Sequence, residues 1–453
     1  MKTILNNIIL NKLKWILNYK KKISFNFLKL NFKKSNRDFY KALNTKHTVF
    51  ILECKQSSPS KGILRKNFNI LKIVNVYKKY ANVISVLTDK KYFNGNFKFL
   101  EKASKNTNLP ILCKDFIIDE FQIYLARYYK ADAILLMLSI LNDNQYKKLE
   151  LVAKKLNMGI LTEILTENDL NRAINLKAKV IGINNRNLND LSINLERTIK
   201  LSTKIPKDVI IISESGITNN IQIRRISKYV NGFLIGSSLM IEKNLNYSVC
   251  KLLLGENKIC GLTRRKDIKL AYNNGIIYGG LIFINNSPRQ INVKKAFNII
   301  LNIPLKYVGV FKNENIKNIV KISKFLNLYA IQLHGKENQY YINILRKFLS
   351  FKIQIWKALN INKKIPERNF KYVKKYIFDN KDGGTGKKFN WNLIKNEFNL
   401  DNVILAGGIN VKNCNEAINL GFIGLDFNSG IEIKPGYKNE KTLNLLFNTL
   451  RKY

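Results

Sequence analysis

Short runs of apolar, β-branched residues recur along the chain, and this recurrence limits the fold more than any other feature of the sequence. In the first half, eight such runs lie at residues 48–54, 83–87, 110–113, 133–137, 159–163, 180–184, 209–213 and 232–236. Strands that are buried on both faces read as continuous apolar runs, and they form parallel sheets joined by helices. Eight units of this kind predict a closed (β/α)₈ barrel, an α/β fold.

The same pattern starts again in the second half of the chain. Eight more runs lie at residues 258–260, 278–283, 307–311, 330–333, 353–356, 376–379, 403–406 and 422–426. The 453 residues suffice for two barrels, because α/β barrels run to about 250 residues each. No stretch rich in Pro, Gly or Ser separates the halves, so we expect two tandem TIM barrels, residues 1–255 and 256–453, joined directly.

An amphipathic segment precedes the first apolar run. Ile4, Ile8, Leu13 and Ile16 recur at helical spacing, so we expect an extra leading helix; an organellar transit peptide is the alternative. The segment lacks the continuous apolar region and the cleavage site of a secretory signal. No apolar run approaches the roughly 18 residues that a membrane span needs. We therefore expect a cytoplasmic protein with no membrane partner.

The net charge of +47 has two interpretations. One is nucleic-acid binding through counterion release. The other is compositional drift that raises Lys, Asn and Ile together. Drift is favoured because the lysines are scattered along the whole chain instead of forming one basic segment. We expect no specific nucleic acid as partner, although a basic surface would attract small phosphorylated substrates.

Residue types that bind metals are scarce. The five cysteines show no CxxC spacing, and the chain has only two histidines, His47 and His334. The sequence therefore predicts no metal site.

Charged residues gather at the ends of the first set of runs. Glu53, Glu163 and Glu214 fall at three run ends, and Lys55 and Lys114 follow two runs. Barrel enzymes place their active sites at the C-terminal ends of the strands. Any one of these charges alone is typical of a solvated loop or a structural ion pair. Together they predict an acid–base set around an anionic substrate.

Glycine and serine turns follow the seventh and eighth runs of both halves. In the first half these are residues 213–217 and 236–238, and in the second half residues 406–409 and 428–430. Backbone amides at such turns bind anions, and this is the usual phosphate site of a barrel. Both halves are therefore predicted to bind phosphorylated ligands.

The mouth of the second barrel is predicted to hold a different set of groups. Cys260 ends the first run, His334 closes the fourth, Asp379 ends the sixth and Arg289 lies beyond the second. A thiol and a carboxyl group on opposite sides of a barrel can act as base and acid. We expect Arg289 and the phosphate-site amides to lower the thiol pKa towards neutrality. The alternative is that Cys260 is a small buried hydrophobic residue, as we expect for the other four cysteines.

Long motifs in each half carry a family resemblance. Those of the first half are FILECKQSSPSKG (50–62), ILCKDFIID (111–119), GINNRNL (182–188), ISESGI (212–217) and GFLIGSSLM (232–240). This half resembles indole-3-glycerol-phosphate synthase. Those of the second half are KICGLTR (258–264), IQLHG (331–335), IFDNKDGGTG (377–386), LAGGI (405–409) and LDFNSG (425–430). This half resembles phosphoribosylanthranilate isomerase, and the order of the halves resembles the fused enzyme of bacterial tryptophan synthesis.

The resemblance implies two consecutive reactions. The second half would convert N-(5-phosphoribosyl)anthranilate to 1-(2-carboxyphenylamino)-1-deoxyribulose 5-phosphate by an Amadori rearrangement. Asp379 would be the general acid that opens the furanose ring, Cys260 the base at ribose C2, and Arg289 the ligand of the anthranilate carboxylate. The first half would then close the indole ring with loss of CO₂ and water.

For the ring closure, the resemblance implies that Lys114 is the general acid on the ketone oxygen, that Lys55 pairs with the substrate carboxylate, and that Glu163 assists dehydration. The remaining catalytic residues implied for this half are Glu53, Asn184, Glu214 and Ser215. Residues implied to contact substrate are Ser58, Ser60, Phe116, Arg186, Gly216, Gly236 and Ser237 in the first half, and Arg289, His334, Gly384, Gly407, Gly408, Asp426, Asn428 and Ser429 in the second.

The resemblance also implies that neither half needs a metal or an organic cofactor, and we expect a monomer. Two other hypotheses stay open from the residues. One keeps both barrels but makes one half catalytically inert, which the loss of a mouth residue would indicate. The other is a basic nucleic-acid-binding protein, which clustered basic and exposed aromatic residues would indicate.

Overall fold

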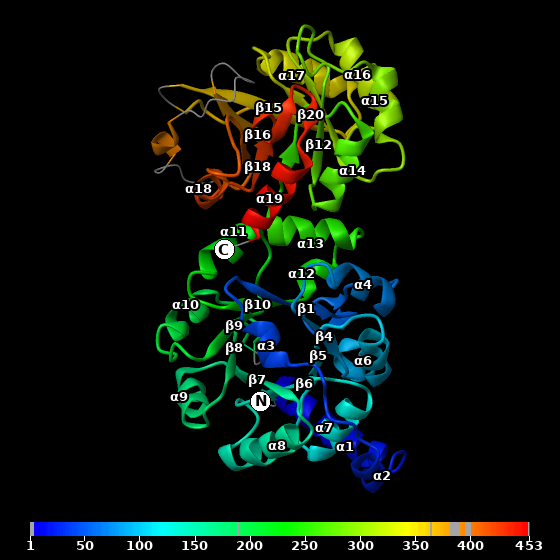
Figure 1. Ribbon diagram of the computed structural model, residues 1–453, viewed down its shortest axis with the longest axis vertical. Helices are drawn as coiled ribbons and strands as arrows, with labels where there is room; N and C mark the ends of the chain where they lie inside the picture. Colours follow the sequence, from blue (N-terminus) through cyan, green and yellow to red (C-terminus); the bar gives the residue numbers. More distant parts are fainter. Residues whose placement is uncertain (1–3, 188–189, 363–364, 381–389, 395–399, 452) are drawn as a thin grey trace. The chain divides into compact units, whose positions relative to one another are not determined.

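The computed structural model describes residues 4–187, 190–362, 365–380, 390–394, 400–451 and 453. Its contacts divide the chain into two compact units, the first taking most of the chain up to Val249 and the second most of the chain from Cys250 onward. Each unit contains one closed barrel of parallel strands (Figure 1). Among the described helices, none is long and apolar enough to cross a membrane.

The first barrel has eight strands, each hydrogen-bonded to its neighbours in parallel register. In chain order they are β1 (Val49–Cys54), β4 (Val83–Leu87), β5 (Ile111–Lys114), β6 (Ala133–Met137), β7 (Gly159–Ile164), β8 (Val180–Asn184), β9 (Ile210–Glu214) and β10 (Gly232–Ile235). β1 pairs with both β4 and β10, which closes the ring. Each apolar run of the first half therefore forms one strand, with ends that differ from the prediction by one residue at most.

Helices cover the outside of this barrel, most of them starting at a polar cap. In chain order the helices are α1 (Ile4–Lys20), α2 (Phe25–Leu30), α3 (Phe39–Leu43), α4 (Ile70–Tyr77), α5 (Lys90–Phe93), α6 (Phe97–Ser104), α7 (Glu120–Tyr128), α8 (Asp143–Lys155), α9 (Glu167–Asn175), α10 (Glu196–Ser202), α11 (Asn220–Ile226), α12 (Ser237–Met240) and α13 (Leu245–Leu254). Asp119 with Gln122 and Asn142 with Gln145 form capping boxes at α7 and α8. These side chains satisfy backbone N–H groups that a helix leaves free at its start. A short hairpin, β2 (Ser57–Ser58) and β3 (Gly62–Ile63), follows β1.

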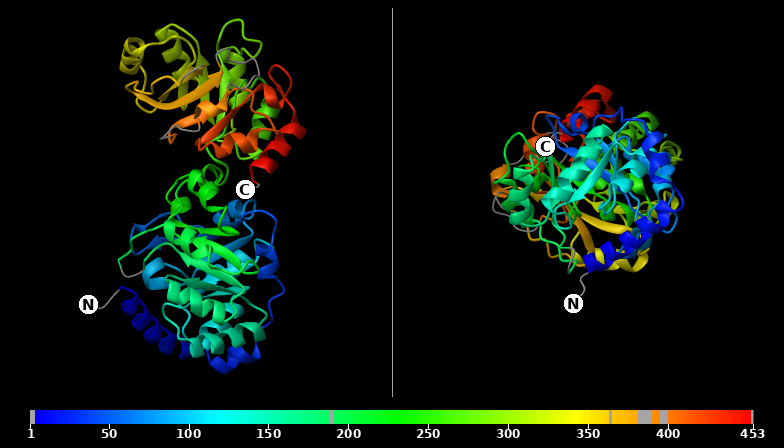
Figure 2. Two further views of the ribbon diagram at one scale, coloured as in Figure 1. Left: turned by 90° about the vertical axis from the view of Figure 1, so that its left-hand side faces the viewer. Right: turned by 90° about the horizontal axis from the view of Figure 1, so that it is seen from below.

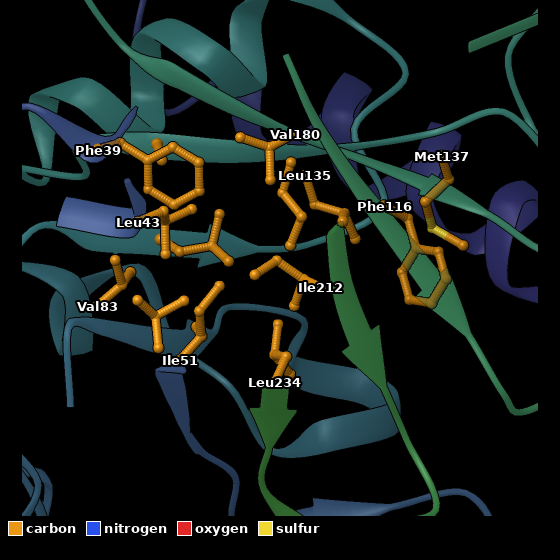
Figure 3. Packing of buried hydrophobic residues seen from close by; sticks show 14 of the residues in the cluster. Phe39, Leu43, Ile51, Val83, Phe116, Leu135, Met137, Val180, Ile212 and Leu234 are labelled. Atoms are coloured by element: carbon orange, nitrogen blue, oxygen red, sulfur yellow. The ribbon is translucent and has the colours of Figure 1, made fainter. Parts of the chain in front are cut away.

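The barrel interior is filled by apolar side chains from all eight strands. Figure 3 shows Phe39 and Leu43 of α3 at one end of this cluster and Phe116 and Met137 at the other. The interior is thus packed and not hollow, as in other barrels. α3 closes one end of it, and Phe116 and Met137 line the cavity at the other end.

The predicted leading helix is confirmed as α1, but one of the residues assigned to its apolar face is wrong. Leu13 is 48% exposed, whereas Lys12 is 3% exposed and lies between buried Ile8 and Ile16. The Lys12 ammonium forms ion pairs with Asp89 (2.6 Å) and Asp115 (2.7 Å). A residue four positions from Ile8 and from Ile16 shares their face, so α1 packs on the barrel through Lys12. α1 and α2 lie beside α7 (Figures 1 and 2).

The second barrel repeats the architecture. Its strands are β11 (Lys258–Ile259), β12 (Tyr278–Ile282), β13 (Lys306–Phe311), β14 (Ala330–Leu333), β15 (Gln354–Ile361), β16 (Val373–Asn380), β17 (Val403–Leu405) and β18 (Gly424–Phe427). β11 pairs with both β12 and β18 and closes the ring. β15 and β16 are longer than predicted, because polar residues such as Lys357, Lys374 and Lys375 lie within both strands among apolar ones. Two tandem barrels are thereby confirmed.

The remaining described elements of the second unit connect and cover these strands. They are α14 (Arg265–Asn273), α15 (Val293–Ile300), α16 (Ile316–Phe325), α17 (Gln339–Phe348), η1 (Trp391–Ile394), α18 (Cys414–Asn419), η2 (Ser429–Ile431), β19 (Glu432–Lys434), β20 (Tyr437–Lys438) and α19 (Glu440–Leu450). β19 and β20 form an antiparallel hairpin directly after β18.

Candidate active sites at the mouths of the two barrels

A cavity opens at the C-terminal ends of the strands of the first barrel. Every residue that the sequence analysis placed in this mouth lies in its wall: Glu53, Lys55, Ser58, Ser60, Lys114, Phe116, Glu163, Asn184, Arg186, Glu214, Ser215, Gly216, Gly236 and Ser237. These residues are spread over the chain from β1 to α12, and closure of the barrel brings them together.

Lys114, the last residue of β5, is the centre of the charged groups in this cavity. Its Nζ lies 2.9 Å from Glu163 Oε2 and 2.6 Å from Glu214 Oε2. The amide of Asn184 donates a hydrogen bond to Glu163 Oε1 at 3.1 Å. One ammonium group is thus held between two carboxylates from β7 and β9, which fixes its position at the base of the cavity.

Burial sets the protonation of this cluster. Burial lowers the pKa of Lys114, but Glu163 and Glu214 outweigh it and raise that pKa above its usual value. Lys114 is therefore a charged proton donor at neutral pH. Burial raises the pKa of Glu214 to about 7, opposed by Lys114 and reinforced by Glu163 and Glu53. Glu214 can therefore both hold and release a proton near neutrality.

A second ion pair lies at the end of β1. Lys55 Nζ lies 2.5 Å from Glu53 Oε1. The backbone of Gly236, after β10, approaches this carboxylate so closely that a β-carbon there would lie 2.4 Å from Glu53 Oε1. Glycine at residue 236 therefore makes room for Glu53, a reason for its presence beyond turn formation.

The turns after β9 and β10 present the features of an anion site. Ser215 and Gly216 have φ angles of 65° and 85°, and successive residues of this kind can turn their N–H groups to one side. In the same cavity wall, the hydroxyl groups of Ser58 and Ser238 are buried without a hydrogen-bond partner among the described residues. These groups are available to a phosphorylated ligand.

Several apolar wall residues were not predicted. Ile8 of α1, Phe93 of α5, and Leu135 of β6 line this cavity. Their sequence context is that of ordinary core residues, so no local signal distinguishes them. Lys12 was also missed, although a lysine on the apolar face of a helix is a signal for a buried ion pair.

A second cavity opens at the corresponding end of the second barrel. Its wall contains Cys260, Arg289, His334, Asp379, Gly407, Gly408, Asp426, Asn428 and Ser429. Gly384, the other residue assigned to this mouth, lies outside the described residues. Gly407 and Gly408 follow β17 with φ angles of 87° and 65°, which again suits a turn that binds an anion.

Asp379 and His334 lie close together in this wall. His334 Nε2 is 3.6 Å from Asp379 Oδ2, and Gln332 Nε2 lies 3.0 Å from His334 Nδ1. Burial, together with Lys258 and Lys357, lowers the pKa of His334 to about 4, so the ring is neutral at pH 7. Burial and the nearby Asp426 raise the pKa of Asp379 to about 6, which makes this carboxyl group a stronger candidate for a proton donor.

The expected lowering of the Cys260 pKa is wrong. Burial raises the pKa of the Cys260 thiol, and the cations that oppose this rise are Lys258 and Lys438. The guanidinium of Arg289 is instead paired with Glu432, with Nη2 2.7 Å from Oε2 and Nε 3.0 Å from the same oxygen. Arg289 is neutralised by this contact, although a guanidinium retains further N–H donors for a substrate carboxylate.

The other four cysteines are buried, as expected, and form no disulfide within the described part of the chain: Cys54, Cys113, Cys250 and Cys414. Lys258 and Lys438, the two cations that act on Cys260, were not predicted, and neither was Glu432, which pairs with Lys438. Lys258 is fully buried, and Lys438 donates to Glu432 at 2.8 Å and to Asn428 at 3.0 Å. The signal for Lys258 was a lysine inside an apolar strand, two residues before the cysteine; Glu432 and Lys438 lie in a hairpin beyond the last run and carry no such signal.

Comparison with known proteins assigns one family to each barrel. The family model of indole-3-glycerol phosphate synthase matches residues 5–252, and that of N-(5'phosphoribosyl)anthranilate (PRA) isomerase matches residues 257–449. Among solved structures, phosphoribosyl anthranilate isomerase from Thermus thermophilus covers 43% of this chain and 98% of its own, at 29% identity with a TM-score of 0.39.

Relatives also match over the full length. Tryptophan biosynthesis protein TrpCF of Buchnera aphidicola subsp. Diuraphis noxia is 56% identical over 451 residues, which cover 100% of this chain and 99% of the relative. The protein of the same name from Yersinia pestis is 52% identical over 452 residues, covering 100% and 95%. With one family on each barrel and relatives that extend over both, the chain belongs to the bifunctional family in which an indole-3-glycerol phosphate synthase precedes a phosphoribosylanthranilate isomerase.

Proposed function

We propose that each barrel of this bifunctional tryptophan-biosynthesis enzyme carries out its reaction with the residues gathered in its own mouth. The second barrel isomerises N-(5-phosphoribosyl)anthranilate to 1-(2-carboxyphenylamino)-1-deoxyribulose 5-phosphate. The first barrel converts that product to indole-3-glycerol phosphate with loss of CO₂ and water. One half is thus a lyase and the other an isomerase.

In the isomerisation, Asp379 donates a proton to the furanose ring oxygen while Cys260 removes one from ribose C2. The raised pKa of Asp379, about 6, supports a proton donor, and the presence of Cys260 in the same cavity wall supports a base that acts on the same sugar. The remaining donors of Arg289 bind the anthranilate carboxylate, and the turns at Gly407–Gly408 and Asn428–Ser429 bind the phosphate.

In the ring closure, Lys114 protonates the ketone oxygen, Lys55 pairs with the carboxylate that leaves as CO₂, and Glu163 assists loss of water. Glu53, Asn184, Glu214 and Ser215 complete the catalytic set. Ser58, Ser60, Phe116, Arg186, Gly216, Gly236 and Ser237 contact the substrate. The observation that carries this assignment is the Lys114 ammonium held within 2.9 Å of Glu163 and 2.6 Å of Glu214, since such a cluster supplies both a proton donor and acceptors.

A two-step assay tests the proposal. Phosphoribosylanthranilate is supplied, and the rearranged intermediate and indole-3-glycerol phosphate are both measured. The parent chain should release indole-3-glycerol phosphate, Lys114→Ala should accumulate the intermediate, and Cys260→Ser should consume no substrate yet still close the ring of added intermediate. If one half were catalytically inert, the parent protein itself would lack one of the two reactions.

The proposal includes small phosphorylated molecules as the only partners, a monomeric state and a cytoplasmic location. Side-chain proton transfers suffice for both reactions, so neither a metal nor an organic cofactor is required. The scattered lysines support the absence of a specific nucleic-acid partner. Size-exclusion chromatography with light scattering tests the monomer, and a sequence-specific gel shift at physiological salt would contradict the partner assignment.

A further inference from the structure

The proposed chemistry does not use one buried cation of the second barrel. The side chain of Lys258 in β11 has no exposed surface, and its Nζ lies 2.7 Å from Asp426 Oδ2. Lys258 is not in the cavity wall, whereas Cys260 and Asp426 both are. A charge removed from water needs a compensating partner, and Asp426 supplies one.

Backbone geometry directs Lys258 and Cys260 to the same side of the chain. Residues two apart along a strand point to the same face. A β-carbon placed at Gly280 in β12 would lie 2.8 Å from Cys260 Sγ and 3.1 Å from Lys258 Cε. Both side chains therefore lie against Gly280 of β12. Because this glycine has no side chain, the thiol and the lysine can approach each other.

Asp426 holds the ammonium group in place from the neighbouring strand. Lys258 and Asp426 are register partners in β11 and β18. The second oxygen, Oδ1, is buried without a hydrogen-bond partner among the described residues. Asp426 therefore contacts Lys258 through one oxygen, and its residue also forms part of the cavity wall.

We propose that Lys258 is a positioning residue of the isomerase mouth, whose buried ammonium, held by Asp426, lies beside Cys260 and stabilises negative charge on Sγ. The inference rests on the proposed role of Cys260 as base. Lys258 acts through Cys260 and does not touch substrate.

The charges that face the thiol are consistent with this role. Lys258 and Lys438 lower the thiol pKa, and Asp426 raises it, against the dominant upward effect of burial. Lys438 is already shared between Asn428 and Glu432. Asp379 and His334 line the same cavity, and the latter is neutral at pH 7. Lys258 is the largest of the opposing influences on Cys260.

The test measures the thiol itself, so that it does not depend on catalysis. The rate at which iodoacetamide alkylates Cys260 is followed against pH in the full-length chain, with the modified peptide quantified by mass spectrometry. Lys258→Met should raise the apparent thiol pKa and slow alkylation at pH 8 by at least about tenfold, corresponding to one pKa unit. Asp426→Asn should lower the apparent pKa and speed alkylation. Opposite shifts from two partners of one ion pair are not expected of a purely structural contact.

Lys375→Met is the control, because Lys375 is a partly buried lysine of the same barrel, with its side chain 12% exposed, that pairs with Glu256 at 2.7 Å. It should leave alkylation of Cys260 unchanged. If circular dichroism shows that Lys258→Met does not fold, alkylation is measured in Asp426→Asn and in the double variant Lys258→Met/Asp426→Asn, which removes both charges of the pair. Iodoacetamide should alkylate Cys260 more slowly in the double variant than in the parent protein. It should alkylate Cys260 faster in Asp426→Asn than in the parent protein. Unchanged alkylation profiles in the folded variants, or slower alkylation in Asp426→Asn, would overturn the inference.

Steady-state kinetics separates this inference from the proposed function. Lys258→Met should lower the isomerase kcat while KM stays within about twofold of the parent value, since only the thiol is altered. If Cys260→Ser isomerises at the parent rate, the role of Cys260 as base fails, whatever the alkylation data show. If Cys260→Ser is inactive but Lys258→Met alters neither kcat nor alkylation, only the positioning role of Lys258 fails.

Discussion

The backbone of Gly182 in β8 lies so close to the side chain of Glu214 in β9 that a β-carbon at residue 182 would be 2.0 Å from Glu214 Oε1. Real β-carbons do not come so close to an oxygen, so any side chain at residue 182 must displace Glu214. Glu214 also lies 2.6 Å from Lys114, and its displacement would move the ammonium group of the ring-closing site.

Gly182→Ala is therefore expected to lower the synthase kcat by about 10²-fold, the cost of a misplacement of about 1 Å in an active site. The isomerase activity of the same chain is the internal control and should be unchanged. Both activities are measured on one preparation, and a loss of both would indicate global misfolding instead of a displaced carboxylate.

Lys114→Ala is expected to reduce ring closure by about 10²–10⁴-fold, because a positioned proton donor is lost. The change also removes the cation that lowers the pKa of Glu214, which should rise further above about 7. Lys148→Ala, at a lysine whose side chain is 73% exposed, is the control and should have no effect. Ring closure near the parent rate in Lys114→Ala would show that the acid is another group.

The sequence predicted the barrels because continuous apolar runs encode strands that are buried on both faces. Because closure of a barrel brings all strand ends to one rim, it also predicted that the charged residues at the strand ends share each mouth, whereas the family resemblance supplied the other wall residues. It did not predict the partner of each charge. Arg289 was expected to act on Cys260, but Glu432, from a hairpin with no periodic signal, binds it instead. Pairing of this kind depends on side-chain packing between segments remote in sequence.

The leading helix also shows that the sequence did not predict the partner of a buried charge. Its helical spacing was evident, but hydropathy assigned exposed Leu13 to the packed face and missed Lys12. A lysine is buried there because two carboxylates, Asp89 and Asp115, face it from the barrel. Only the fold brings those carboxylates to the helix, so a lysine on the apolar face could signal a buried ion pair but could not identify its partners.

Lys12→Met tests whether this ion pair holds α1 over the first mouth. The substitution leaves two buried carboxylates without their cation, a change that costs about 3–5 kcal/mol when a buried pair is broken. Urea unfolding followed by circular dichroism should show this loss. Because Ile8 of α1 lines the first cavity and Asp115 follows Lys114, synthase activity should fall while isomerase activity persists. Lys14→Met, at an exposed residue of the same helix, should change neither.

The two halves are expected to fold and work separately. Each barrel closes on itself, β1 with β10 and β11 with β18, and interfaces between domains of one chain are usually modest and polar. Fragments 1–255 and 256–453 should therefore each retain one activity when expressed alone. Insoluble or inactive fragments would place the boundary elsewhere or show that each barrel needs the other.

The pH dependence of isomerisation gives the most specific prediction. The reaction needs Asp379 protonated and Cys260 ionised, yet the pKa of Asp379 is raised only to about 6 and that of the thiol is raised above its usual value of 9.0. Between these two pKa values, the protonated fraction of Asp379 falls with rising pH as fast as the thiolate fraction of Cys260 rises. The product of the two fractions is therefore small and nearly constant.

Below pH 6 Asp379 is already protonated, so a further drop in pH only removes thiolate and the rate falls. Above the thiol pKa, Cys260 is fully ionised, so a further rise only deprotonates Asp379 and the rate falls again. We expect a bell-shaped profile of kcat/KM whose acid limb reports Asp379 and whose alkaline limb reports Cys260. Asp426→Asn removes a negative charge that raises both pKa values, so it should move both limbs to lower pH. An acid limb that does not move would show that a group other than Asp379 titrates there.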